Sequence, residues 1–497
     1  MAAESIQTLD VSRLTAETLV MDNPVLVKHV RSRLRKQHVI PNIVILVIIA
    51  ALSTWSCFKL NAVHEGYAFS IICVLQGAIL FVGGTSQVAS AVAQARETGI
   101  LDFHRVSPLS ALAVTLGFVL GAPIREWVAF VTLIPFSLAC VAGGNPDAVG
   151  WLKCMAAMIV AALLYHTVGA LVGATSKPRT AGGVAVVVVV LLFFVGSVFW
   201  RLTPTPAIAE AIGQAKDLPL TSKFFGLSFS QFNLGLMHQV PLLAFLLIAT
   251  VRKIRQERAF VYAKPIAILF LAILAIYLLG DTHTWDYARV TFDGFEAVFV
   301  AYFMTVAGIM LTTAVTPSWG AFANGVRRAR KANRVRPRPM EDMASNLAPV
   351  IAFAVIVLAA PVASSLLRHA PHHLLAPASL GGVVASATVL MFGCAQQAFE
   401  LTLRRSAKGY FALLLFLAWV VPLLLAAVAG ITQMGERVTM TLLSISPLAG
   451  IGITAVMLDP SIKAQAAPVV AVSVSVAWAL LFLVISISAA RKAEAEV

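Results

Sequence analysis

The sequence predicts an all-α, polytopic membrane protein with about twelve transmembrane helices in two six-helix halves, preceded by an interfacial amphipathic helix. Of its 497 residues, 59% are apolar and only 12% are charged, and the mean hydropathy is +0.88, which excludes an ordinary water-soluble domain. Apolar runs of roughly 20 residues, enough to cross about 30 Å of hydrocarbon, recur along the whole chain. Lysine and arginine gather in the short loops between these runs.

The chain is expected to divide into three parts. A polar tail is predicted at 1–22, a first six-span half at 23–258 and a second at 259–497, with the basic run R-K-I-R-Q-E-R closing the first half. No small-residue cleavage site follows a short apolar core near the start, so we expect the first span to act as its own insertion signal.

An amphipathic helix is expected directly after the tail. Asn23 is a good N-cap and Pro24 a good first-turn residue, and apolar residues then recur every four positions. The other faces carry Lys28, Arg31, Arg33 and Arg35. A helix this basic does not cross the bilayer, so we expect it to lie on an anionic leaflet, and a plain positive-inside anchor would look the same.

The apolar runs predict the spans in order. The first two are expected at 39–58 and 67–93, and the run 109–142 as one helix of about 51 Å, so that part of it projects into the cytosol as a lever. Arg125 and Glu126 then form a candidate intramembrane polar pair about one turn inside the inner boundary. Their side chains diverge by about 100°, so each snorkels or pairs with a neighbouring helix. The later spans are expected at 151–175, 180–200, 240–251, 265–279, a run ending near 315, 347–367, 380–403, 410–431 and 466–488.

Small residues inside the spans indicate close packing. Two G-x-x-x-G spacings, Gly117 with Gly121 and Gly169 with Gly173, let helices approach one another closely. The cysteines show no C-x-x-C motif and no histidine at ligand spacing, so we expect them to be small core residues. They are Cys57, Cys73, Cys140, Cys154 and Cys394.

Three segments between spans are unusual in composition. The half-apolar segments 201–237 and 432–463 each follow the fifth span of a half, and we expect short helices dipping into the outer face, either as an exit gate or as interfacial loops. Segment 318–346 is the most basic, and its position mirrors that of the turn between the second and third spans. A loop that binds the anionic leaflet is the alternative to a second functional turn.

The basic residues also predict the orientation. With both termini in the cytosol, the inner segments carry 27 of the 37 lysines and arginines, as the positive-inside rule requires. This arrangement explains the net charge of +14 without a nucleic-acid partner.

The turn at 94–109, Q-A-R-E-T-G-I-L-D-F-H-R-V-S-P-L, concentrates charge between two apolar runs and must therefore lie in water or against a protein. A short helix is expected, opened by Glu97 and Thr98 and closed by Ser107 and Pro108, since a residue before proline avoids the helical region. From composition alone, a solvated hairpin between two spans is an equal alternative.

Two stretches resemble the membrane subunits of type-2 ATP-binding cassette (ABC) exporters. These are A-R-E-T-G-I-L-D at 95–102, followed by V-S-P-L-S at 106–110, and N-P-V-L-V-K-H-V-R-S-R-L-R at 23–35. The resemblance covers roughly residues 23–260, and the chain departs from the family pattern at His29, Ala95 and Ile100. It implies that the charged turn couples the chain to an ATPase. The coupling residues it implies are Arg96, Glu97, Gly99, Leu101, Asp102 and Arg105.

The resemblance also implies the partners and the location. A separate cytosolic ABC ATPase, in two copies, would bind ATP and Mg, so no cofactor is expected in this chain. The chain would be a multi-pass protein of the plasma membrane, specifically a bacterial inner membrane. An apolar interior with few charges weakly favours a lipid-like, peptide or hydrophobic cargo, and the transported substrate is otherwise unknown.

No catalytic or metal site is predicted. The phosphate-binding motif G-x-x-x-x-G-K-[ST] does not occur, so the chain does not hydrolyse ATP by that route. His369, His372 and His373 cluster around Pro371, but no carboxylate accompanies them and the proline breaks helical spacing.

Two alternatives to an ATP-driven exporter remain. An ion-gradient-driven secondary transporter with repeated halves usually carries ionisable groups near the bilayer midplane, which are nearly absent here. A membrane enzyme or a non-transporting scaffold would not need a cytosolic ATPase.

Overall fold

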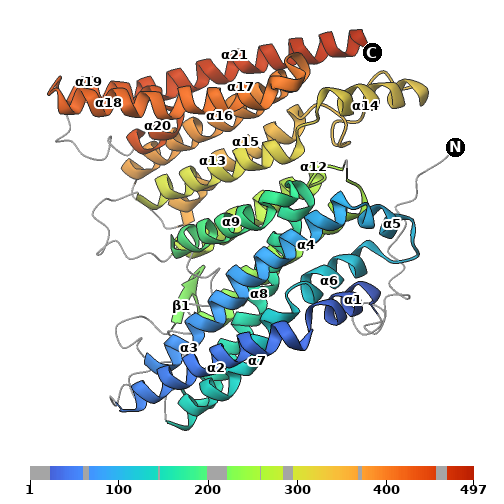
Figure 1. Ribbon diagram of the computed structural model, residues 1–497. Helices are drawn as coiled ribbons and strands as arrows, with labels where there is room; N and C mark the ends of the chain where they lie inside the picture. The colour runs from blue at the N-terminus through green and yellow to red at the C-terminus, as the bar shows by residue number, and fades with distance from the viewer. Residues whose placement is uncertain are drawn as a thin grey trace. The chain divides into compact units, whose positions relative to one another are not determined.

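A computed structural model of the chain describes residues 23–59, 67–143, 146–198, 221–257, 259–283, 295–367, 372–454 and 467–497 (Figure 1). The described residues are helical apart from loops and one two-stranded hairpin, β1 (Thr221–Phe224) and β2 (Leu227–Ser230). The all-α prediction is therefore confirmed. The chain forms two compact units, Met1–Ser222 with Ser228–Ala259, and Lys223–Leu227 with Phe260–Val497. The predicted tail 1–22 lies outside the described residues.

The first unit contains the helices that surround the charged turn. They are α1 (Pro24–Arg33), α2 (Lys36–Lys59), α3 (Tyr67–Gly77), the π-helix η3 (Ala78–Gly84), α4 (Thr85–Glu97), α5 (Ile100–Val106), α6 (Ala111–Gly121), α7 (Ile124–Ala142), α8 (Ala148–Thr175), α9 (Pro178–Val198) and α11 (Gln231–Arg255). Helix α8 is central to this unit, since α4 and α11 both pack along it.

Close helix packing in the first unit depends on the two predicted G-x-x-x-G spacings. A Cβ on Gly117 would lie 2.7 Å from the Val25 Cβ of α1, and a Cβ on Gly173 would lie 2.4 Å from the Ala89 carbonyl oxygen of α4. Gly121 and Gly169 are similarly close to α1 and α4. The prediction of tight packing is confirmed, and the spacings join α6 to α1 and α8 to α4.

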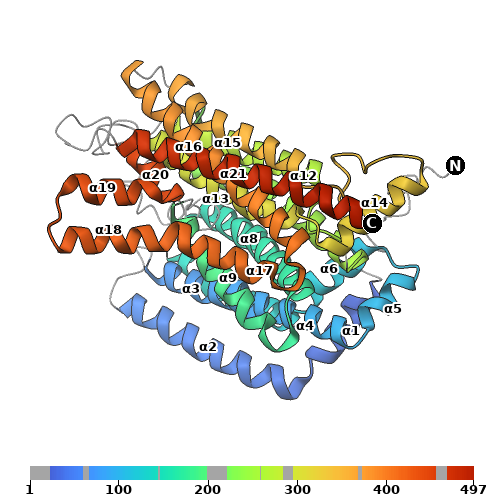
Figure 2. The same cartoon turned by 90° about the horizontal axis from the view of Figure 1, so that it is seen from above.

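The second unit is built around the long helix α16, against which α15, α13 and α21 pack; α16 and α21 run side by side in Figure 2. Its elements are α12 (Lys264–Thr282), α13 (Phe295–Val315), α14 (Trp319–Lys331), α15 (Leu347–Leu367), α16 (His372–Thr402), η6 (Arg404–Ser406), α17 (Ala407–Leu415), η7 (Phe416–Val420), α18 (Val421–Ile431), α19 (Glu436–Ile445), α20 (Pro447–Ile453) and α21 (Ala467–Glu496).

Eleven helices among the described residues are long and apolar enough to cross a membrane. With α9, whose described residues include the shorter apolar helix Pro178–Val189, every one of the twelve predicted spans has a helix. The grouping into six spans per half stays a prediction.

The third predicted span is not one long helix, so the prediction that part of it projects into the cytosol as a lever is wrong. The chain breaks at Ala122 and Pro123, which separate α6 from α7. Proline lacks the amide hydrogen that an inner helical turn needs, and its ring collides with the preceding turn. Only α7, with 19 residues, is long enough to span, while α6 packs against α1.

The unusual outer segments differ from one another. In the first, residues 221–230 form the β1–β2 hairpin instead of short helices, and α11 starts at Gln231, earlier than the predicted 240. The Phe225-Gly226 turn has φ values of 48° and 82°, which favours a tight hairpin over a helix. The second segment does contain two short helices, α19 and α20. Residues 199–220 and 455–466 lie outside the described residues.

Candidate functional site

The charged turn folds as the end of one helix, a glycine, and a second short helix. Glu97 and Thr98 end α4 instead of opening the next helix, because Gly99 adopts a left-handed conformation with φ of 74°. A residue with a side chain is strained there, and glycine is not. Ser107 then ends α5 in an extended conformation before Pro108, as predicted.

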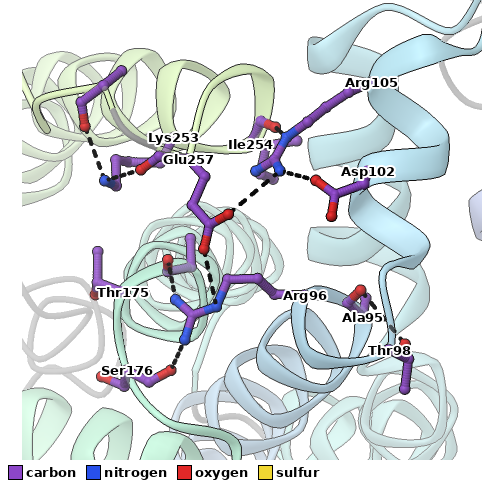
Figure 3. Close-up of polar contacts among 12 residues, drawn as sticks. Ala95, Arg96, Thr98, Asp102, Arg105, Thr175, Ser176, Lys253, Ile254 and Glu257 are labelled. Atoms are coloured by element: carbon purple, nitrogen blue, oxygen red, sulfur yellow. Dashed lines mark hydrogen bonds and ion pairs between the residues drawn. The ribbon is translucent and has the colours of Figure 1, made fainter.

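Arg96 connects the turn to the C-terminal end of α8 through two hydrogen bonds. Its Nη1 donates to the Ala174 carbonyl at 2.5 Å and its Nη2 to the Ser176 carbonyl at 2.6 Å (Figure 3). The last carbonyls of a helix lack partners within the helix and lie at the negative end of its dipole. A guanidinium satisfies both needs, so Arg96 has a structural role inside the turn.

Arg105 connects α5 to the C-terminal end of α11 through a hydrogen bond. Its Nε donates to the Ile254 carbonyl at 2.9 Å, and its Nη1 bonds to the Asp102 carboxylate one turn earlier (Figure 3). Glu257 lies between the two arginines: one carboxylate oxygen is 3.9 Å from Arg96 Nε and the other is 3.7 Å from Arg105 Nη1. The ends of α4, α5 and α11 thus share one ion network, and Arg96 extends it to the end of α8.

The outward face of α5 combines a carboxylate with apolar side chains. Asp102 and Phe103 are each 68% exposed and Val106 is 84% exposed, while Leu101 on the opposite face is buried among α1, α4 and α6 residues. Glu97, at the end of α4, is also exposed. Phe103 and Val106 thus give α5 an exposed apolar face beside its carboxylate.

The structure therefore divides the six predicted coupling residues by position. Glu97 and Asp102 face outward, Arg96 and Arg105 bind helix ends, Leu101 is core and Gly99 sets the backbone. Sequence reasoning missed Phe103, Val106 and Glu257. Glu257 is the single acidic residue within the basic run 252–258, and this was the sequence signal that could have identified it.

The predicted interfacial helix α1 is bound to protein along one side. Asn23 caps it as expected, and its Nδ2 also donates to the Ala113 carbonyl of α6 at 2.6 Å. Of the four basic residues, Arg31 and Arg35 are exposed, whereas Arg33 Nη1 donates to Gln87 Oε1 of α4 at 2.6 Å. Lys28 is exposed at the rim of a cavity.

Arg125 and Glu126 occupy the first turn of α7, where Glu126 faces the favourable end of the helix dipole. Glu126 lies beside the π-helix η3, since a Cβ on Gly83 would be 3.5 Å from its Cγ. Arg33 of α1 is close enough to exert a charge effect on Glu126. Arg125 exerts the larger of the two charge effects on Glu126, so this carboxylate is influenced both by its neighbour and by α1.

The basic segment of the second unit forms α14 and an ordered loop. Lys264 is buried and donates to the Ala344 and Ser345 carbonyls at 2.7 and 2.9 Å, which holds the loop against α12. Arg334 pairs with Glu341 and Arg336 with Glu494. Arg327, Arg328 and Lys331 remain exposed. Leaflet binding and a second docking turn both fit this arrangement.

Among the described residues no group of three or more His, Cys, Asp and Glu side chains is arranged to hold a metal ion. His369 lies outside those residues, and the side chains of His372 and His373 are not described. The five cysteines are buried, as expected of core residues.

The fold is that of a multi-pass membrane protein with a charged turn between two of its helices. Comparison with known families supports this class: residues 25–213 match the family model described as ABC-2 type transporter. This part of the chain is therefore similar to a permease family of ABC transporters. The matched domain is the non-catalytic membrane component of such transporters, which in general work with an ATPase partner. No curated protein and no solved structure matches the chain.

Proposed function

We propose that this chain forms the translocation pathway of an ATP-driven exporter powered by a separate ATPase, which docks on the outward face of α5. The observation that carries the proposal is the combination of an exposed Asp102, Phe103 and Val106 face with a partly exposed ion network beside it. Apolar side chains provide contact area on docking, and Arg96, Arg105 and Glu257 hold the helix rigidly enough to transmit force to α8 and α11.

The ATPase would be a cytosolic ABC subunit in two copies, and it would bind the ATP and Mg. This chain would then lie in a bacterial inner membrane with both termini in the cytosol, consistent with the distribution of its basic residues. The ordered basic segment with α14 is the candidate for contact with the second ATPase copy.

Co-purification tests the proposal. The chain is isolated from its host membrane, and an ATPase subunit is expected to accompany it. Phe103→Asp with Val106→Asp should reduce the recovered ATPase at least about tenfold, because burying two carboxylates in an apolar contact costs several kcal/mol. Glu97→Lys with Asp102→Lys should release or uncouple it as well.

Met434→Asp is the matched control, since Met434 is also an exposed apolar residue but follows α18 on the predicted outer face. It should leave the recovered ATPase unchanged. If no nucleotide-binding protein accompanies the wild-type chain, the proposal is wrong and a gradient-driven transporter becomes the better interpretation.

A further inference from the structure

A basic cavity of about 310 Å³ lies beside the coupling turn, within the first unit. Helix α1 contributes Lys28, His29 and Arg33, α4 contributes Gln94 and its C-cap Thr98, and α5 contributes His104. The cavity therefore touches the interfacial helix and both helices of the turn.

The lining is positively charged, although Glu126, which lies outside it, exerts a charge effect on Arg33. No carboxylate is among the residues that line the cavity, while Lys28 and Arg33 each carry a full positive charge. Burial and the charges of Arg33 and Lys28 lower the pKa of His29 to about 4, and burial and Lys28 lower the pKa of His104. At neutral pH the cavity thus holds two fixed charges and two neutral imidazoles.

The lining also supplies hydrogen-bond donors. Arg33 uses Nη1 for Gln87, which leaves its other N–H groups for the cavity. His104 Nδ1 is buried and has no hydrogen-bond partner among the described residues. A neutral imidazole donates one N–H and Lys28 donates three, so the cavity offers donors from α1 and α5 toward a common space.

We propose that this cavity binds a phosphate group, either from a lipid headgroup or as a free phosphate, between α1 and α5. Two fixed charges match the dianionic charge of a phosphate monoester, and arginine and lysine bind phosphate oxygens through charge-assisted hydrogen bonds. The volume admits a phosphate together with the first atoms attached to it. A bound phosphate would join the membrane-surface helix to the helix that carries the docking face.

The test measures binding to the purified full chain in phosphatidylcholine nanodiscs without any ATPase, so that its result is independent of the proposed docking. Inorganic phosphate and dioctanoyl phosphatidic acid are titrated separately, and the thermal unfolding midpoint is followed. One of the two is expected to raise the midpoint in a saturable manner. Saturation by the lipid alone identifies a headgroup site, and saturation by inorganic phosphate identifies a site for free phosphate.

Two double variants separate a discrete site from general attraction to a basic helix. Lys28→Gln with Arg33→Gln removes both cavity charges and should weaken binding at least about tenfold. Arg31→Gln with Arg35→Gln removes two charges from the same region outside the cavity and should change binding less than about twofold. Lys28→Glu alone provides the same test without disturbing the Arg33–Gln87 contact.

Two results would overturn the proposal. One is the absence of saturable binding for both ligands. The other is equal weakening by the two double variants, because that shows diffuse attraction to α1 instead of a site.

Discussion

At the scale of single residues, the site depends on one acid between two arginines. Glu257 lies within reach of Arg96 and Arg105, and each arginine also binds the carboxyl end of a different helix. The ion pairs are partly exposed and longer than hydrogen bonds, so each contributes only about 0.5 kcal/mol. Together, these ion pairs hold α5 in one orientation.

Replacing Glu257 should therefore loosen α5 without unfolding the chain. Glu257→Gln is expected to raise amide hydrogen exchange in α5 about fivefold, which corresponds to a loss of about 1 kcal/mol of local stability. Glu494→Gln, which breaks the Arg336 pair of the second unit, serves as the control and should leave α5 exchange unchanged. Unchanged exchange in Glu257→Gln would show that the ion network does not hold the turn.

A second residue-scale prediction concerns the loss of folding stability at low pH. The pKa of His29 is lowered from 6.5 to about 4, first by burial and then by Arg33 and Lys28. The unfolded chain takes up this proton at a higher pH than the folded chain, so stability is full above pH 6.5 and falls as the pH drops from about 6.5 toward 4. His29 packs edge-on against Phe118, with ring centroids 5.2 Å apart. The loss of stability at low pH is therefore expected at the contact between α1 and α6.

The measurement is the thermal unfolding midpoint at pH 7.5 and pH 5 in phosphatidylcholine nanodiscs and a phosphate-free buffer. His29→Phe keeps a ring against Phe118 but has no proton to bind, so its midpoint should fall less on acidification than that of the wild type. An identical fall in both proteins would assign the acid sensitivity to other groups.

At the scale of elements, close contact between helices is decided by glycines that face a neighbour's backbone. Gly173 of α8 faces the Ala89 carbonyl of α4, whereas Gly183 of α9 has nothing within 4 Å of an added Cβ. The G-x-x-x-G spacing in the sequence predicted tight packing, but the identity of the partner helix depended on the three-dimensional fold.

The same substitution at these two glycines should have opposite effects. Gly173→Ala is expected to destabilise the chain by about 1–3 kcal/mol, since the added methyl group pushes α4 away. Gly183→Ala should be neutral or stabilising by up to about 1 kcal/mol, because alanine favours a helix. Thermal unfolding of both variants checks this, and equal destabilisation would contradict the α4–α8 contact.

At the scale of the whole molecule, the distribution of basic residues predicts which surfaces face the cytosol. All five native cysteines are buried, so a single introduced cysteine can be labelled over a low background. Met434 and Val106 are both exposed, but they are predicted on the outer and the cytosolic side, respectively. In intact cells a membrane-impermeant maleimide should therefore label Met434→Cys and leave Val106→Cys unlabelled until the membrane is permeabilised. Labelling of Val106→Cys from outside would reverse the orientation and remove α5 from the reach of a cytosolic ATPase.

The sequence by itself determined the all-α membrane class, the approximate positions of most membrane helices and the location of the charged turn. These follow from hydropathy, proline and the distribution of charge, which are local properties of the chain. The roles of Arg96, Arg105 and Glu257 were decided only by tertiary structure. Arg96 meets carbonyls about 80 residues away and Arg105 meets one 149 residues away, and no local pattern encodes such contacts.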